Sequence, residues 1–102
     1  MSWRNKKNEV VGCADGFRMS VQADEFTYCS PRINGAERYT QVEIGFPSDY
    51  EELIIDWAED REDPTGTVYG YVPVSVVTNV LAKHGGMVSG EVPAGVAPLA
   101  AV

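Results

Sequence analysis

The residue types that most often carry chemistry in proteins are sparse in this chain of 102 residues. It contains one histidine, His84, and two cysteines, Cys13 and Cys29, which do not form a C-x-x-C pair. A metal site needs several such ligands at workable spacing, and the sequence contains none of the glycine-spaced motifs for phosphate, dinucleotide or serine-nucleophile chemistry. We therefore predict no catalytic residue, no metal site and no cofactor, and a protein that is not an enzyme.

His84 has two interpretations. Near neutral pH an imidazole is suited to act as a general base. However, His84 closes a helical pattern and directly precedes Gly85. At such a position a donor or a cation satisfies the last carbonyl groups of a helix. The structural role is the commoner one, and we prefer it.

The two cysteines also favour a structural role. No basic residue adjacent in sequence to Cys13 or Cys29 would lower the pKa of its thiol. A disulfide or a reactive thiolate is the alternative. We expect two free thiols that are buried as small hydrophobic groups.

Acidic residues are concentrated in one stretch of the chain. Eight of the fifteen Asp and Glu residues fall between positions 49 and 63, where only Arg61 offsets them, and the net charge of the chain is −7. An acidic protein repels nucleic acid and anionic membranes and attracts basic surfaces. We therefore predict a protein partner with a basic surface, and no direct contact with nucleic acid or membrane. The eight acids are Asp49, Glu51, Glu52, Asp56, Glu59, Asp60, Glu62 and Asp63.

Five of these acids would share one side of a helix. Glu52, Asp56 and Asp60 repeat at the i, i+4 spacing, and Glu59 and Asp63 would extend the same band. Like charges at this spacing, and acids near the C-terminal end of a helix, would destabilise it by about 1–3 kcal/mol in total. Two interpretations follow. The band is either a solvated face that keeps the protein soluble, the commoner role of surface charge, or a docking surface for a basic partner.

A second candidate for partner binding is an aromatic pair. Tyr69 and Tyr71 flank Gly70 in a predicted strand, so both rings are expected on the same side, and Gly70 leaves room for a close backbone approach. Such pairs more often pack in a core or across strands. The alternative is an exposed platform that anchors a partner.

A third candidate is a ligand site around a turn. Arg32, Arg38 and Tyr39 bracket the turn dipeptide Asn34-Gly35. Two guanidinium groups and an aromatic ring fit a phosphate-bearing ligand, although no glycine nest or helix start supports such a site.

The first half of the chain predicts an antiparallel meander. Alternating or apolar runs indicate strands over residues 9–14, 17–22, 26–30 and 38–46, with turn signals between them. The side chains expected to face the core are Phe17, Met19, Val21, Val42, Ile44 and Phe46.

The second half adds helices. Ser48 and Glu51 have capping-box spacing, and Tyr50, Leu53, Ile54 and Trp57 follow helical spacing, so a helix is predicted over residues 48–63. A strand over 67–72 and a helix from Pro73 to His84 follow. Residues 87–102 are rich in Pro, Ala, Val and Gly and show no period, which predicts a flexible tail.

The expected fold class is therefore α+β, an antiparallel sheet of about four to five strands with two helices packed on one face. The expected organisation is a single domain over residues 1–86 followed by the tail 87–102. No apolar run is long enough to span a membrane, and no secretory signal is recognisable, so we expect a cytoplasmic protein.

The run TVYGYVPVSVVTNVLAKHGG at 67–86, with VEIGFPS at 42–48 before it, resembles small accessory proteins encoded by tailed bacteriophages or prophages. The resemblance covers about half of the chain and includes no motif with assigned chemistry, so no functional residue is transferred from it. It implies a non-enzymatic inhibitor of host machinery. Anti-CRISPR and other anti-defence proteins are of this kind, and several are small, acidic and bind basic nucleic-acid-handling surfaces. The compartment would then be the host cytoplasm.

The leading hypothesis is therefore a binding protein that blocks a host protein by occupying its basic surface. One alternative is a small virion or assembly component, whose tail and basic N-terminus (Arg4, Lys6 and Lys7) reach neighbouring subunits. Another is a small-ligand binder that sequesters a nucleotide signal through Arg32, Arg38 and an aromatic side chain. A homo-oligomer is compatible with each hypothesis.

Overall fold

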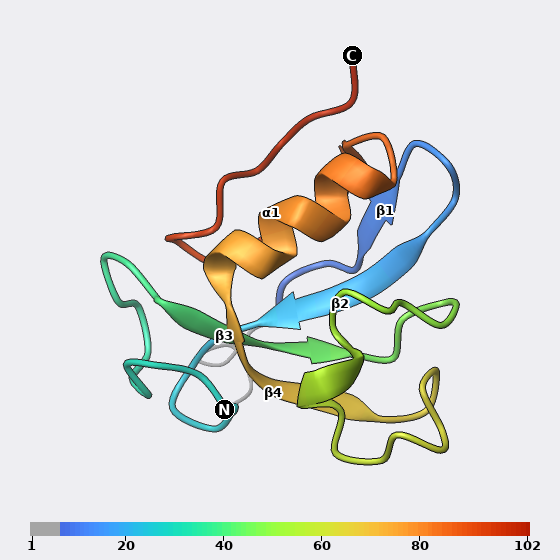
Figure 1. Ribbon diagram of the computed structural model, residues 1–102. Helices are drawn as coiled ribbons and strands as arrows, with labels where there is room; N and C mark the ends of the chain where they lie inside the picture. Colours follow the sequence, from blue (N-terminus) through green and yellow to red (C-terminus); the bar gives the residue numbers. More distant parts are fainter. Residues whose placement is uncertain (1–6) are drawn as a thin grey trace.

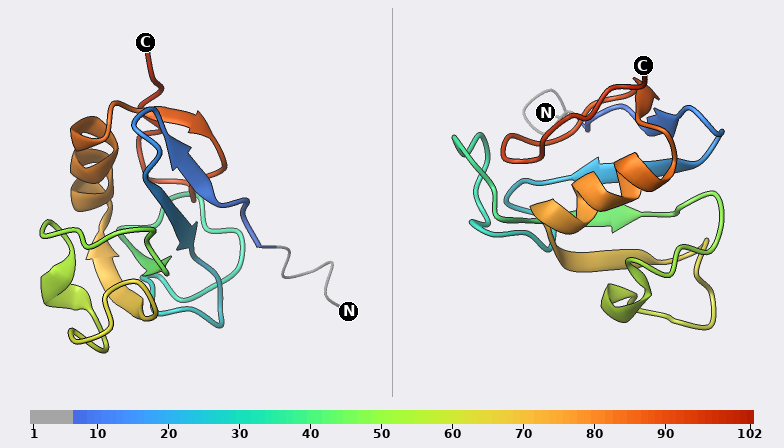
Figure 2. Two further views of the ribbon diagram at one scale, coloured as in Figure 1. Left: turned by 90° about the vertical axis from the view of Figure 1, so that its right-hand side faces the viewer. Right: turned by 45° about the horizontal axis from the view of Figure 1, so that its top comes forward.

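The structure is a computed structural model that describes residues 7–102 (Figure 1). Five strands form one antiparallel sheet in the order β4-β3-β2-β1-β5, and helix α1 (Val74–Lys83) crosses one face of it (Figures 1 and 2). The predicted α+β class with an antiparallel sheet of about four to five strands is confirmed. The strands are β1 (Val11–Cys13), β2 (Arg18–Gln22), β3 (Gln41–Gly45), β4 (Val68–Pro73) and β5 (Met87–Ser89).

The first four strands form an antiparallel meander. β1, β2 and β3 lie within three of the four strands predicted for the first half of the chain, and β4 is the strand predicted over 67–72. The Asp15-Gly16 turn joins β1 to β2, with Gly16 at a φ of 95° that glycine adopts without strain. Met19 and Val21 on β2 are fully buried, as expected from their spacing. Their burial fixes which face of the sheet carries the core, because a slip of one residue would expose both side chains.

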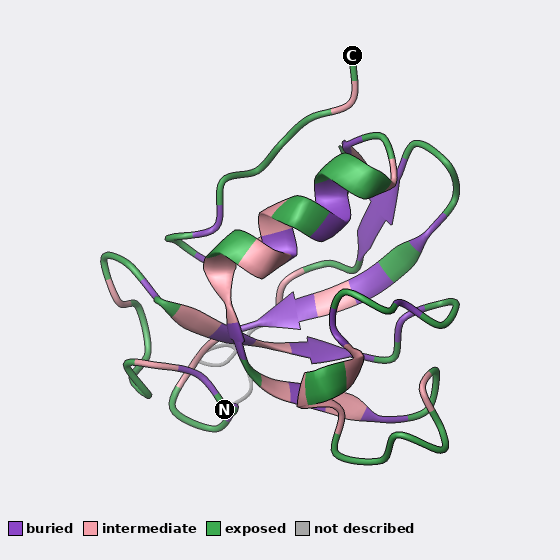
Figure 3. Cartoon of the chain, viewed as in Figure 1, coloured by how far each residue is buried: buried purple, intermediate pink, exposed green. Residues whose placement is uncertain are grey.

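Helix α1 covers that core. Val77, Val80 and Leu81 are fully buried on the side that faces the sheet (Figure 3). The helix ends where the sequence predicts, since the chain turns at Gly85 with a φ of 87°. After this turn the chain reaches β5, which pairs with β1.

The predicted second helix over residues 48–63 is wrong. Within residues 7–102 the structure has one α-helix, and this region contains only a three-residue 3₁₀ helix, η2 (Ile55–Trp57). Ser48 does not cap a helix. Its hydroxyl oxygen accepts a hydrogen bond from the Arg18 backbone N–H (2.9 Å), and its own N–H donates to the Arg18 carbonyl (2.8 Å). Tertiary contacts therefore override the local helical pattern.

The predicted strand over residues 26–30 is also wrong, although Ser30 forms an isolated bridge with Gln41. Asp24 folds this region into turns, because its carboxylate accepts from the Phe26 N–H and its carbonyl accepts from the Thr27 N–H. Phe46, expected in the core, is exposed and has a φ of 49°, so the chain leaves the plane of β3 there.

Residues 87–102 belong to the fold rather than forming a tail outside it. Residues 87–89 are strand β5, and the Tyr39 N–H donates to the Ala94 carbonyl at 2.8 Å. Val96 is 5% exposed and joins the hydrophobic core. A Cβ at Gly95, which has a φ of 108°, would overlap the Tyr39 carbonyl oxygen. The structure therefore shows no boundary after residue 86.

Two further predictions concern the basic N-terminus and the absence of a membrane span. Arg4 and Lys6 of the predicted basic N-terminus lie outside the described residues, whereas Lys7 forms a 3.9 Å ion pair with Asp24. No helix in residues 7–102 is long and apolar enough to cross a bilayer.

Replacing Val96 with alanine tests whether the C-terminal residues contribute to the core. Because Val96 is almost fully buried, V96A should lower the free energy of unfolding by about 2 kcal/mol, measured by urea denaturation. Val88 in β5 is 63% exposed, so the control V88A should change it by less than about 0.5 kcal/mol. Equal effects of the two variants would show that residues 87–102 do not pack as described.

Candidate functional site

The most unusual polar arrangement in the structure lies beneath residues 49–63, here called the acidic segment. Seven of its eight acidic side chains are exposed, which agrees with either a solvated face or a docking surface. The eighth, Glu51, is 0% exposed. Burying a carboxylate is strongly unfavourable unless it is paired and hydrogen-bonded, so its surroundings need an explanation.

Three donors surround the Glu51 carboxylate. Oε2 accepts hydrogen bonds from the Lys83 ammonium group (2.9 Å) and from the Leu53 backbone N–H (2.9 Å). Oε1 lies 2.6 Å from Nε2 of His84. Lys83 and His84 are neighbours at the C-terminal end of α1, where the partial negative charge of the helix also favours cations.

His84 extends this network to the β1–β2 turn. Its Nδ1 lies 2.6 Å from Oδ2 of Asp15, and its ring stacks on Phe17 with 4.1 Å between centroids and an interplanar angle of 11°. An ionised carboxylate only accepts hydrogen bonds. Both ring nitrogens can donate only when the imidazole is protonated, so this geometry describes an imidazolium. We call Asp15, Glu51, Lys83 and His84 the ion cluster.

The ion cluster shifts the pKa values of its members. Burial alone would lower the pKa of His84, but the hydrogen bonds to Glu51 and Asp15 outweigh burial and raise it. Burial alone would raise the pKa of Glu51, but the hydrogen bonds from Leu53, Lys83 and His84 together lower it. The pKa of Asp15 is lowered by the hydrogen bond from the Phe17 N–H and by His84. Each shift favours the charged form.

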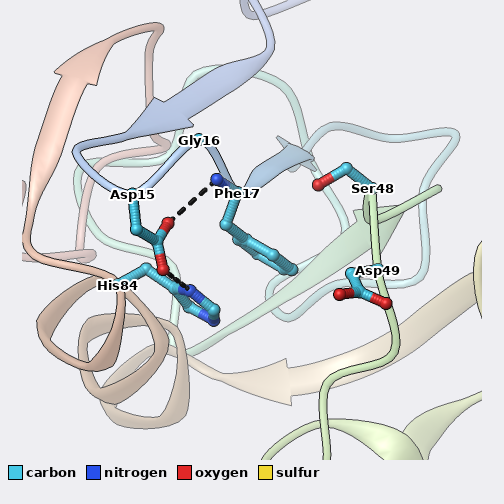
Figure 4. A pocket seen from close by; sticks show the side chains of 6 residues that line it. All are labelled: Asp15, Gly16, Phe17, Ser48, Asp49 and His84. Carbon is cyan, nitrogen blue, oxygen red and sulfur yellow. Dashed lines mark hydrogen bonds and ion pairs between the residues drawn. The ribbon is translucent and has the colours of Figure 1, made fainter.

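A shallow pocket of about 280 Å³ opens beside His84 (Figure 4). Asp15 and His84 form one side, Ser48 and Asp49 face them, and Phe17 lies between. His84 is not placed to act as a general base here, because both of its nitrogens already contact carboxylates. Among residues 7–102, no group of three or more His, Cys, Asp or Glu side chains is arranged to hold a metal ion.

The structure separates the two tyrosines that were predicted to share one side of a strand. Tyr69 is 0% exposed and its hydroxyl donates to the Pro64 carbonyl at 2.6 Å, so it cannot contact a partner. Tyr71 is 44% exposed, with a φ of 57°. The register of β3 and β4 shifts between these positions, because β4 carries one extra residue there. Such a bulge interrupts the alternation of side chains.

Tyr71 pairs instead with Tyr28, with 5.9 Å between ring centroids. A Cβ at Gly70 would lie 3.0 Å from the Cβ of Tyr28, so the close approach predicted at this glycine is confirmed. The guanidinium of Arg32 lies 5.3 Å from the centre of the Tyr28 ring. These residues form an exposed aromatic pair flanked by a cation.

Arg32, Arg38 and Tyr39 do not surround a common ligand site. Tyr39 is buried, and its hydroxyl donates to the Ile33 carbonyl (2.7 Å) and accepts from the Ala36 N–H (3.2 Å), so it holds the 33–36 turn. Arg38 extends toward Gly95, whereas Arg32 lies over Tyr28.

Both cysteines are buried, as expected for small hydrophobic groups. Burial, and in second place the charge of Asp15, raises the pKa of the Cys13 thiol. A raised pKa keeps that thiol protonated and unreactive near neutral pH.

Sequence reasoning found His84 at the end of α1 but missed its partners. Asp15 was interpreted as a turn residue and Glu51 as part of a helix cap, and 69 and 33 residues separate them from His84. Local periodicity gives no information about contacts between residues so far apart in the sequence. The only available hint was Lys83-His84, two basic residues at a helix end in an acidic chain.

Comparison of the chain with protein-family models, with curated proteins and with solved structures gave no match.

Replacing Glu51 with glutamine tests the ion cluster. E51Q leaves Lys83 and His84 without their shared charge partner, and it should lower the free energy of unfolding by about 2–3 kcal/mol, measured by urea denaturation. Glu52 is an exposed neighbour that lies 3.9 Å from Lys83. The control E52Q should therefore change stability by less than about 0.5 kcal/mol. Two equally tolerated substitutions would contradict the assigned role of Glu51.

The ion cluster also predicts greatest stability in mildly acidic solution. The raised pKa of His84 gives a contribution that is complete below its ordinary value of 6.5 and is lost as pH rises through the folded pKa. The lowered pKa of Glu51 gives a contribution that is complete above 4.5 and is lost as pH falls through the folded pKa. Urea unfolding should therefore show higher stability at about pH 5.5 than at about pH 8.5.

The control for this pH dependence is His84→Asn. The variant should be less stable overall. It should also lose most of the decline in stability between the two pH values, because it lacks the imidazole whose pKa the ion cluster raises. An unchanged decline in the variant would assign the pH dependence to other groups.

Proposed function

We propose that this chain is a non-enzymatic binding protein whose acidic segment docks on a basic surface of a partner protein. The observation that supports this proposal best is the contrast between one buried acid and seven exposed acids within residues 49–63. One acid is buried to fix the segment, and seven remain exposed to solvent. Charge on the rim of an interface speeds and orients association more than it adds affinity.

Apolar side chains next to these acids support docking over simple solvation. Phe46, Tyr50 and Leu53 are all exposed at or beside the start of the acidic segment. Phe46 holds its exposed position at a φ of 49°, which is unfavourable for a bulky residue. Strained backbone persists where the surrounding structure enforces it, and it is frequent at binding sites. An interface commonly combines such anchors with a charged rim.

The anchoring of Glu51 supports the same proposal on energetic grounds. A segment without regular secondary structure would lose conformational freedom on binding, which weakens association. Here the bonds of Glu51 to Leu53, Lys83 and His84 hold the start of the segment before any partner arrives. Such preorganisation reduces the entropy lost in the complex.

The resemblance to phage accessory proteins extends the proposal to a role. In that role the partner is a host protein that handles nucleic acid or acts in defence, and the acidic segment occupies the basic surface that this protein uses for nucleic acid. Of the two tyrosines predicted as anchors, Tyr71 remains a candidate, together with its neighbour Tyr28, since Tyr69 is buried.

A charge-removal variant tests the docking role. Glu52→Gln, Asp56→Asn and Glu59→Gln remove three exposed charges, while Asp60 and Asp63, whose side chains lie in the 60–66 turns, stay in place. We expect association with the basic partner captured by the wild-type chain to slow at least about tenfold at low salt, and the salt dependence to flatten. The measurement is surface plasmon resonance at two salt concentrations.

The control removes the same three units of charge elsewhere. Glu9→Gln, Glu25→Gln and Glu37→Gln are exposed sites outside the acidic segment, and this variant should retain most of the wild-type association rate. If the two triple variants slow association equally, binding depends on net charge alone and the acidic segment is not the docking surface.

A further inference from the structure

We propose that Asn34 is a site of slow chemical modification, where the side-chain amide is lost by deamidation, and that Glu25 restrains this reaction. The proposal goes beyond docking and does not depend on it, because every measurement below is made on the free protein. Among the asparagines of the chain, Asn34 alone precedes a glycine. The others precede Lys, Glu or Val, whose side chains obstruct the backbone nitrogen that attacks in this reaction.

Deamidation begins when the backbone nitrogen of Gly35 attacks Cγ of Asn34. The new N–Cγ bond closes a succinimide ring, the bond from Cγ to Nδ2 breaks, and the amide proton of Gly35 leaves with that nitrogen as ammonia. Water from the solvent then opens the ring. Opening at Cγ gives aspartate. Opening at the backbone carbonyl gives isoaspartate, whose main chain runs through Cβ and Cγ and is therefore longer by a methylene group.

The attacking nitrogen is accessible in the structure. Asn34 and Gly35 are both exposed, and beyond the two neighbouring residues no atom lies within 4 Å of the position that a Cβ at Gly35 would occupy. Within residues 7–102, no backbone hydrogen bond holds the Gly35 N–H. Nothing in the surrounding fold therefore shields the nitrogen or keeps water from the ring.

Glu25 holds the other reacting group, the amide of Asn34. Oδ1 accepts a hydrogen bond from the Glu25 backbone N–H (3.0 Å), and Nδ2 donates to the Glu25 carboxylate. Attack makes Cγ tetrahedral and expels Nδ2, so the bond from Nδ2 must be given up. Attack also needs a deprotonated Gly35 nitrogen, and a nearby carboxylate disfavours that negative charge. Both effects slow the reaction.

Each product changes the turn around Asn34. The Tyr39 hydroxyl bonds to the Ile33 carbonyl (2.7 Å) and to the Ala36 N–H (3.2 Å), one on each side of the reacting pair. Isoaspartate lengthens the main chain between these two groups, so the turn must rearrange around Tyr39. Aspartate has no N–H to donate and places a second carboxylate beside Glu25.

The experiment follows the free protein at neutral pH and physiological temperature by intact mass spectrometry, with peptide mapping to locate isoaspartate. We expect conversion at Asn34 that is slower than in the free peptide Arg-Ile-Asn-Gly-Ala-Glu, which is residues 32–37. Asn34→Gln should abolish the rapid part of the mass gain. No conversion at Asn34 after the peptide has fully reacted would overturn the assignment of the site, and equal rates would overturn the restraint.

Two variants test the role of Glu25. Glu25→Ala removes an exposed carboxylate, so the fold persists, and conversion at Asn34 should be at least about threefold faster, as expected for the loss of one hydrogen bond. Glu37→Ala removes an exposed carboxylate near the same turn and should convert at the wild-type rate. Acceleration that is equal in the two variants, or absent in Glu25→Ala, would overturn the restraint.

Discussion

The burial of the Glu51 carboxylate is the interaction on which the rest of the structure depends. An unpaired carboxylate at this depth would be strongly destabilising, so its position requires donors from other elements. Lys83 and His84 supply them from the end of α1, and Asp15 holds the other side of the imidazole from the β1–β2 turn. One buried charge thus joins the helix, the sheet and the acidic segment.

This requirement also explains why the acidic segment is not a helix. Glu51 bonds to the N–H of Leu53 with its side chain, and Asp60 likewise bonds to the N–H of Glu62. Such local bonds compete with the helical pattern. A helix over these residues would also bring like charges together at i, i+4. In the observed arrangement the other seven acids are exposed and do not lie on one α-helix, so the destabilisation expected for a helical band of like charges does not arise.

Sequence patterns correctly predicted the strands and the helix that are specified by the periodicity of their own apolar residues. Met19 and Val21 on β2, and Val77, Val80 and Leu81 on α1, repeat with the periods of a strand and a helix, and each element forms as predicted. Two of the failures have distant causes. Tyr71 is exposed because the register with β3 shifts at Gly70, and Val96 is buried because residues far from it in sequence cover it. No window of local periodicity contains that information.

The pairing of β5 with β1 has a consequence for how the chain folds during synthesis. β1 leaves the ribosome well before one of its neighbours, β5, because 73 residues (14–86) lie between the two strands. The β1–β2 hairpin can form early because its contacts are local, whereas closing the sheet requires a long loop. Until then one edge of β1 has free backbone groups, the kind of edge on which other chains add strands. The interval before β5 emerges is therefore when this chain is most exposed to aggregation and to chaperones.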